Sequence, residues 1–175
     1  MLGEGYDIFE EQVKWAKIAE YIYMATRRDV ISLADDEEYR LKDIDVKDGI
    51  KFVEIKCEPR AVETRNFYIE LRNASNKKHN GLGYFYYSEA DYICFIDMKE
   101  CVIYWINLSY FRQWVRPLCL KRFEKNEADW GLLLPIEYLN DWGIPKEMRR
   151  IKKFDKKILD DALKKYGISD INAIS

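Results

Sequence analysis

Asp48 and Gly49 separate two runs of alternating apolar and polar residues, and this feature constrains the fold more than any other. The stretch reads "DIDVKDGIKFVEIKC" and spans residues 43–57. An Asp-Gly pair between alternating runs is the strongest short-range signal for a β-hairpin, because both residues tolerate the positive φ angles of a tight turn. The sequence therefore predicts an antiparallel hairpin with Asp48 and Gly49 as its two turn residues.

This turn fixes which residues face each other across the hairpin. Lys47 would face Ile50, Asp45 would face Phe52, and Asp43 would face Glu54. One face of the hairpin would then be charged, with Asp43, Asp45, Glu54 and Lys56. The other face would supply the core, with Ile44, Val46, Val53 and Ile55. The hairpin is thus predicted to be half buried, with a polar cluster at one end.

Three carboxylates on one small patch repel each other unless a positive charge lies among them. Hard oxygen ligands of this kind suit Mg²⁺ or Mn²⁺, and Mg²⁺ commonly binds through only one or two carboxylates. A lysine beside such a site can orient water or meet developing negative charge. These are the components of phosphodiester hydrolysis. The competing interpretation is an ordinary solvated sheet face.

The rest of the chain predicts a mixed α/β domain. Periodic apolar residues indicate an amphipathic helix over residues 7–29, and alternation indicates strands over 66–72, 91–97 and 101–108. We expect one mixed β-sheet flanked by helices, formed by residues 1–120. Residues 121–175 are expected to form a C-terminal helical extension packed on the same domain, including a long helix that ends at Gly167.

Composition excludes several classes of protein. The 175 residues are 48% hydrophobic and 34% charged, which is typical of a folded domain rather than a disordered chain. Four cysteines without CxxC spacing and a single histidine, His79, argue against a zinc site. No leader-like or membrane-spanning segment is apparent, so we expect a cytoplasmic protein without membrane contact.

The cluster resembles the catalytic motif of the PD-(D/E)xK nuclease superfamily, of phage or prokaryotic type. The resemblance covers roughly residues 7–116 and rests on an N-terminal helix with Glu10, Glu11 and Glu20, the "DID" strand, the "EIK" triplet and the following "TRNFYIEL" strand. It implies a restriction-endonuclease-like fold. The proline of the motif is missing, because Ile44 precedes Asp45 and Lys42 precedes Asp43.

The resemblance also implies roles for individual residues. Asp45 and Glu54 would bind the metal, the main-chain carbonyl of Ile55 would assist, and Lys56 would support the attacking water. Hairpin pairing favours Asp43 as the partner of Glu54, whereas the likeness to phage-type members favours Asp45; we prefer Asp45 and keep Asp43 as an additional candidate ligand.

Other charged residues are assigned around this cluster. Glu70 would join the metal site if its strand pairs in register, although a solvated edge position is as good a reading. Glu11 and Glu20 would support the site from the N-terminal helix. Basic residues are candidates for contact with DNA phosphates, against ordinary solvation: Lys77, Lys78, Arg112 and Arg116. The aromatic run of residues 84–87 is interpreted as packing.

The sequence therefore predicts a Mg²⁺- or Mn²⁺-dependent deoxyribonuclease with DNA as partner, and it leaves a homodimer open. Its alternative is a non-catalytic nucleic-acid-binding or assembly module that retains the nuclease fold. A third reading is the same fold acting on RNA.

Overall fold

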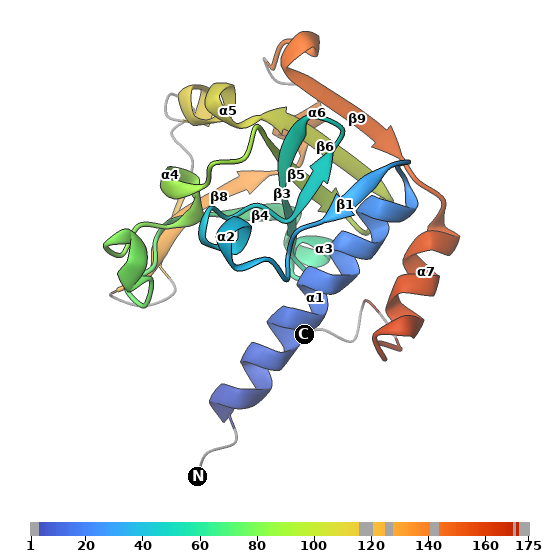
Figure 1. Cartoon of the computed structure of the whole chain (residues 1–175), viewed down its shortest axis with the longest axis horizontal. Helices are drawn as coiled ribbons and strands as arrows, with labels where there is room; N and C mark the ends of the chain where they lie inside the picture. The colour runs from blue at the N-terminus through green and yellow to red at the C-terminus, as the bar shows by residue number, and fades with distance from the viewer. Residues whose placement is uncertain (1–3, 116–120, 125–127, 141–143, 170, 172–175) are drawn as a thin grey trace.

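Two sheets and their covering helices make up the computed structural model, which describes residues 4–115, 121–124, 128–140, 144–169 and 171 (Figure 1). The described strands are β1 (Val30–Ser32), β2 (Val46–Asp48), β3 (Lys51–Cys57), β4 (Asn66–Arg72), β5 (Tyr92–Asp97), β6 (Val102–Asn107), β7 (Lys121–Glu124), β8 (Trp130–Pro135) and β9 (Arg149–Lys153). The described α-helices are α1 (Glu4–Ala25), α2 (Glu37–Leu41), α3 (Ala61–Thr64), α4 (Tyr84–Tyr87), α5 (Leu108–Val115), α6 (Glu137–Asn140) and α7 (Lys156–Lys165). Two 3₁₀ turns are η1 (Lys77–His79) and η3 (Lys146–Met148).

The large sheet has the strand order β1-β2-β3-β5-β6-β9. Its strands pair antiparallel except for β3 and β5, which run parallel. Parallel neighbours need a long crossover, and residues 58–91 provide it, with α3, β4 and α4. The predicted mixed sheet flanked by helices is therefore confirmed.

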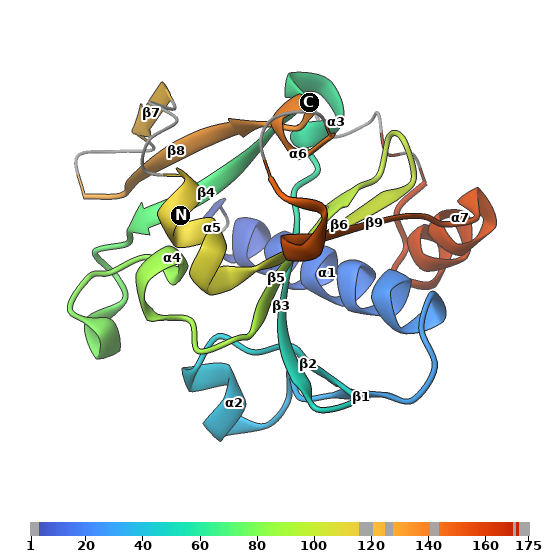
Figure 2. The same cartoon turned by 90° about the horizontal axis from the view of Figure 1, so that it is seen from above.

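Both faces of the middle of this sheet are covered, so its inner strands β5 and β6 are buried and mostly apolar on both sides. On one face, α1 and α7 lie side by side and pack on the sheet through Trp15, Ile18, Ile22 and Leu159 (Figures 1 and 2). On the other face, β4, β8, α5 and α6 contribute Phe67, Leu134, Phe111 and Leu139 to a second cluster. The charged residues of β3 lie on this second face, because Glu54 pairs with Ile93, whose side chain belongs to the same cluster.

The predicted hairpin exists, but its turn is displaced. Val46 pairs with Val53 and Asp48 with Lys51, so the two turn residues are Gly49 and Ile50 rather than Asp48 and Gly49. Gly49 has a φ of 63° and Ile50 does not have a positive φ, as in a type II′ turn with glycine at its first central position. The shift in pairing amounts to two residues, so the predicted face of Val46, Val53 and Ile55 is preserved. The prediction for Ile44 is wrong, because residues 43–45 lie before the regular strand and Ile44 packs in the cluster on the opposite face.

Two further predictions about the fold are wrong. The strand at residues 66–72 does not join the large sheet, because β4 pairs with β8 in a separate three-stranded sheet of order β4-β8-β7. The residues after 120 do not form a helical extension either. They contribute β7, β8 and β9, and β9 pairs with β6 at the edge of the large sheet. Only α7 remains of the long helix that was expected over residues 146–167.

Candidate functional site

The site begins where the pairing of β2 with β3 stops. Asp45 continues the hairpin by donating its N–H to Val53 O at 3.0 Å. Asp43 has a φ of 55°, which turns the backbone away from the strand direction. The backbone N–H of Ile55 on β3 would therefore have no main-chain carbonyl of the neighbouring strand as its partner. The Asp45 carboxylate supplies one, because Ile55 N donates to Asp45 Oδ2 at 2.7 Å.

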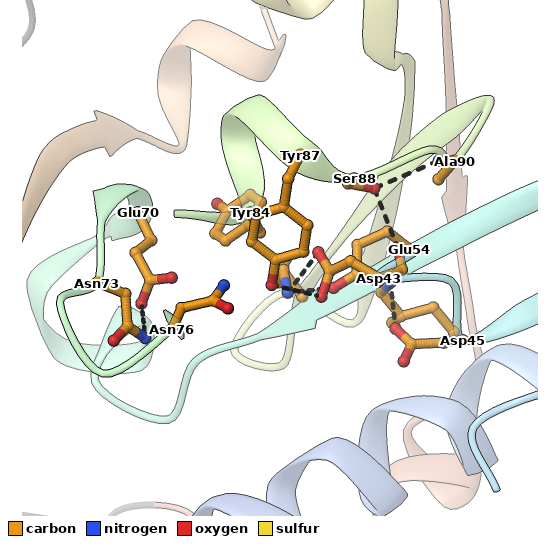
Figure 3. Close-up of polar contacts among 12 residues, drawn as sticks. Asp43, Asp45, Glu54, Glu70, Asn73, Asn76, Tyr84, Tyr87, Ser88 and Ala90 are labelled. Atoms are coloured by element: carbon orange, nitrogen blue, oxygen red, sulfur yellow. Dashed lines mark hydrogen bonds and ion pairs between the residues drawn. The ribbon is translucent and has the colours of Figure 1, made fainter. Parts of the chain in front are cut away.

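Glu54 and Lys56 project together from β3, because alternate residues of a strand share a face. The Glu54 side chain is 3% exposed and forms an ion pair through Oε1 with Lys56 Nζ. Lys56 Nζ also lies 3.7 Å from Asp43 Oδ2 and 4.2 Å from the centre of the Tyr84 ring. The ammonium is thus held between two carboxylates and an aromatic face, and Figure 3 shows Asp43, Glu54 and Asp45 gathered at this end of the hairpin.

The charges of this acid cluster, which we define as Asp43, Asp45 and Glu54, are not balanced by Lys56 alone. Burial raises the pKa of the Asp45 carboxyl to about 6, although the Lys56 ammonium opposes the shift. Burial also raises the pKa of Glu54, and the neighbouring carboxylates add to this. Burial alone would lower the pKa of Lys56, but the three carboxylates raise it overall. Lys56 is therefore protonated, whereas Asp45 and Glu54 hold their protons more tightly than exposed carboxyl groups do.

Two carboxylate oxygens in the cluster are buried without a hydrogen-bond donor among the described residues: Glu54 Oε2 and Asp43 Oδ2. A buried acceptor that is left unbonded costs free energy. Crowded carboxyl groups with buried oxygens that accept no hydrogen bond are a donor set that a small divalent cation can satisfy.

No group of three or more His, Cys, Asp or Glu side chains in the described part of the chain is arranged to hold a metal ion. A cage of that kind is not required for Mg²⁺, which usually keeps several waters and binds through one or two carboxylates. The acid cluster therefore fits a divalent cation in donor type and charge. Glu54 and Asp45, with Asp43 beside them, are the residues that would hold it.

The hairpin register changes the relation between the two aspartates. Asp45, not Asp43, takes the position opposite Glu54, since the pairing of Val46 with Val53 continues one residue further. The pairing argument that favoured Asp43 is therefore wrong in its register. Asp43 nevertheless reaches the cluster from the turn before β2, with its carboxylate close to Lys56.

An aromatic wall that sequence reasoning treated as packing borders the cluster. Tyr87 donates its hydroxyl to Asp43 Oδ1 at 3.5 Å, and Ser88 Oγ donates to Asp43 O at 3.1 Å. His79 stacks on Tyr87 with ring centres 3.9 Å apart. Tyr84 carries the ring under Lys56 and donates its hydroxyl to Tyr68 O at 2.9 Å. The run "YFYY" before Ser88 is the sequence feature that marks this wall, but only the fold shows which of these tyrosine rings lie against the acid cluster.

The structure does not bring every predicted acid into the cluster. Glu70 lies on β4 of the second sheet, where Asn73 Nδ2 donates to its Oε2 at 3.3 Å. In Figure 3, Tyr84 and Tyr87 lie between Glu70 and the acid cluster. Glu11 is exposed on α1, and Glu20 is half-buried on the same helix. Because α1 packs on the opposite face of the large sheet, neither glutamate is placed beside Glu54.

The predicted basic contacts are similarly dispersed. Lys77 and Lys78 are exposed in η1. Arg112 is engaged within the fold, because its Nε donates to Phe85 O at 2.6 Å and its Nη2 to Ser88 O at 2.7 Å. This clamp holds the segment that carries Tyr87. Arg116 lies outside the described residues.

Comparison with known proteins adds no assignment: no family model matches the chain, and no curated protein or solved structure matches it significantly. Among the described residues, no helix has the length and apolar character needed to cross a membrane. The acid cluster is therefore the feature of the molecule from which its function is inferred.

Proposed function

We propose that this protein is a metal-dependent nuclease of the restriction-endonuclease-like, PD-(D/E)xK type that hydrolyses DNA phosphodiester bonds. The observation that carries the proposal is the acid cluster with Lys56 on adjoining strands. Two carboxylates, Asp43 and Glu54, meet the Lys56 ammonium there and Asp45 lies beside them, while Glu54 Oε2 is buried without a hydrogen-bond donor among the described residues. A purely structural ion pair needs one carboxylate for one ammonium, whereas this cluster gathers three carboxyl groups around Lys56.

Each residue has a distinct part in the proposed reaction. Glu54 and Asp45 would hold a Mg²⁺ or Mn²⁺ ion, with Asp43 adding negative charge beside them and the main-chain carbonyl of Ile55 as a further oxygen donor. When bound, the ion would supply charge neutralisation and Lewis-acid activation at a phosphodiester. The raised pKa of Lys56 keeps it an ammonium ion. It therefore acts by stabilising negative charge that develops on the phosphate, not as a general base.

The second candidate is a binding or assembly module that retains the fold without catalysis. One observation favours it: the Lys56 ammonium forms an ion pair with Glu54, which a purely structural role would also explain. A module of this kind would retain nucleic acid without cutting it. The same pair would then serve stability alone.

Cleavage assays separate these candidates and identify the substrate. The full-length protein would be incubated with supercoiled, linear, single-stranded and branched DNA, and with RNA, in Mg²⁺, Mn²⁺ or EDTA. The proposal predicts metal-dependent cutting of at least one DNA substrate and loss of cutting in the Glu54→Gln variant. Retention of DNA without cutting in either metal would support the binding module. Cutting confined to RNA would move the proposal to a ribonuclease.

A further inference from the structure

A second charged surface lies at the far edge of the large sheet, separated from β3 by β5 and β6. The chain has a net charge of −2, yet residues 146–157 contain seven Lys or Arg and only two Asp or Glu. This segment comprises η3, β9 and the start of α7. Positive charge is therefore concentrated on one edge of an otherwise acidic protein, and we call this segment the β9 edge.

The strand itself is open to solvent. β9 pairs only with β6, and the strand order ends there. Arg150, Ile151, Lys152 and Lys153 are all exposed. Figure 1 shows β9 running along the outside of the molecule toward α7. Successive side chains point to opposite faces of the sheet, so cations flank the edge on both sides.

Some of these cations are used within the fold and others are not. Arg149 donates to Leu139 O and Asn140 O, and Lys152 Nζ donates to Thr26 O at 2.7 Å just beyond the last turn of α1. No Asp or Glu of the described residues lies within ion-pair distance of Arg150 or Lys153. The latter two side chains therefore carry uncompensated charge at the surface.

Charged residues on an edge strand also prevent pairing with strands of other proteins. One lysine is often enough for that purpose. Protection of the edge therefore does not explain why this segment has a charge of +5, from seven cations and two anions. The same residues discourage a β-strand partner while they attract a polyanion. The chemistry thus favours phosphates over a protein strand.

We infer that the β9 edge binds the phosphate backbone of DNA, as a docking surface distinct from the acid cluster. The choice of DNA as the ligand rests on the proposed function. The contact itself needs no metal and no intact cluster. It would hold the duplex by charge, without reading its sequence.

The test measures binding under conditions that block cleavage. Fluorescence anisotropy would follow a labelled DNA duplex and the full-length protein in EDTA over a series of salt concentrations. The test variant is Arg150→Gln/Lys153→Gln. The matched control is Lys14→Gln/Lys17→Gln, which removes the same charge from exposed positions on α1. Competition with polyglutamate and with anionic phospholipid vesicles identifies the preferred kind of anion.

We expect the β9 variant to bind the duplex about tenfold more weakly and to lower the salt slope of log K by about 2, one unit for each lost phosphate contact. The control should bind like the parent protein. Equal binding by both variants would overturn the inference, as would stronger competition by polyglutamate or by vesicles than by unlabelled DNA. If the parent protein binds DNA through the β9 edge but does not cut it in Mn²⁺, the proposed nuclease activity would be contradicted and DNA binding by the β9 edge would be supported.

Discussion

At the scale of single residues, Lys56 is the side chain on which both stability and rate are expected to depend. Removing its charge by Lys56→Met leaves Glu54 buried without a counter-ion, which should cost about 3 kcal/mol of unfolding free energy. Cleavage should fall about 10²-fold, comparable to the loss of one electrostatic stabiliser. Urea denaturation and single-turnover cleavage measure the two effects separately.

The double variant Lys56→Met/Glu54→Gln is the control for stability. It removes both charges and should recover most of the lost unfolding free energy, because no uncompensated charge remains at position 54. A single Lys56→Met variant that is as stable and as active as the parent protein would show that Lys56 is not part of the site.

Asp45 gives a prediction about pH. Its pKa is raised to about 6 in the folded protein, compared with about 3.9 in the unfolded chain. The folded state therefore binds the Asp45 proton more tightly than the unfolded chain does. The free energy of unfolding gained from this protonation is fully present below pH 4 and is lost as the pH rises through 6. Asp45→Asn keeps an acceptor for Ile55 N–H and does not titrate. Relative to the parent, this variant should gain roughly 2 kcal/mol between pH 4 and pH 7.

Metal-free urea denaturation at several pH values measures this difference, with Asp29→Asn as a control at an exposed position. The described environment of Asp45 would be contradicted if the free energy of unfolding changed with pH in the same way for the parent protein and for Asp45→Asn between pH 4 and pH 7.

At the scale of elements, Gly83 controls how α4 approaches β4. A Cβ at this position would lie 2.4 Å from Glu70 O, which is backbone and cannot move aside easily. Gly83→Ala should therefore cost more than about 2 kcal/mol and displace the segment with Tyr84 and Tyr87. Gly49→Ala is the matched control, because it has a positive φ but open space, and should cost only about 1 kcal/mol. Denaturation curves of equal midpoint for the two variants would refute the close packing.

The β2–β3 hairpin shows what the sequence could and could not specify at this scale. Alternation predicted the faces of Val46, Val53 and Ile55 correctly, and the side-chain period of two made those faces insensitive to a two-residue shift. Alternation failed for Ile44, which precedes the regular part of β2. The turn itself was misplaced because Gly49 serves equally well at either central position of a primed turn. Asp45 was consequently paired with Phe52 instead of Glu54.

β9 was missed for a different reason. Its residues "RRIKK" have no apolar alternation and a weak preference for strands, so the neighbouring helical pattern of α7 dominated the interpretation. Only hydrogen bonding to β6 makes this segment a strand. β4 was recognised as a strand, but the choice of β8 as its partner depends on long-range packing that a local pattern does not contain.

At the scale of the whole molecule, a bound divalent cation should stabilise the folded state by mass action. At a concentration tenfold above Kd the gain is about 1.4 kcal/mol. For a chain of this size the melting temperature should rise by about 3–6 °C. Differential scanning calorimetry in Mg²⁺ or Mn²⁺ tests this, with Ca²⁺-free EDTA buffer as baseline and Glu54→Gln as control. A melting temperature that is unchanged at millimolar metal, or that rises equally in Glu54→Gln, would argue against binding at the acid cluster.

Single-turnover cleavage of DNA in Mn²⁺ by the parent protein and three isosteric variants tests the proposed nuclease site itself. Asp45→Asn and Glu54→Gln remove charge from the two residues that face each other across the hairpin, and each should lower the rate at least ~10²-fold. Asp43→Asn should lower it less, because Asp43 reaches Lys56 only from the turn before β2. All variants should remain folded by circular dichroism. Cleavage that survives in Asp45→Asn and Glu54→Gln, or is absent from the folded parent protein in every divalent metal, would contradict the account.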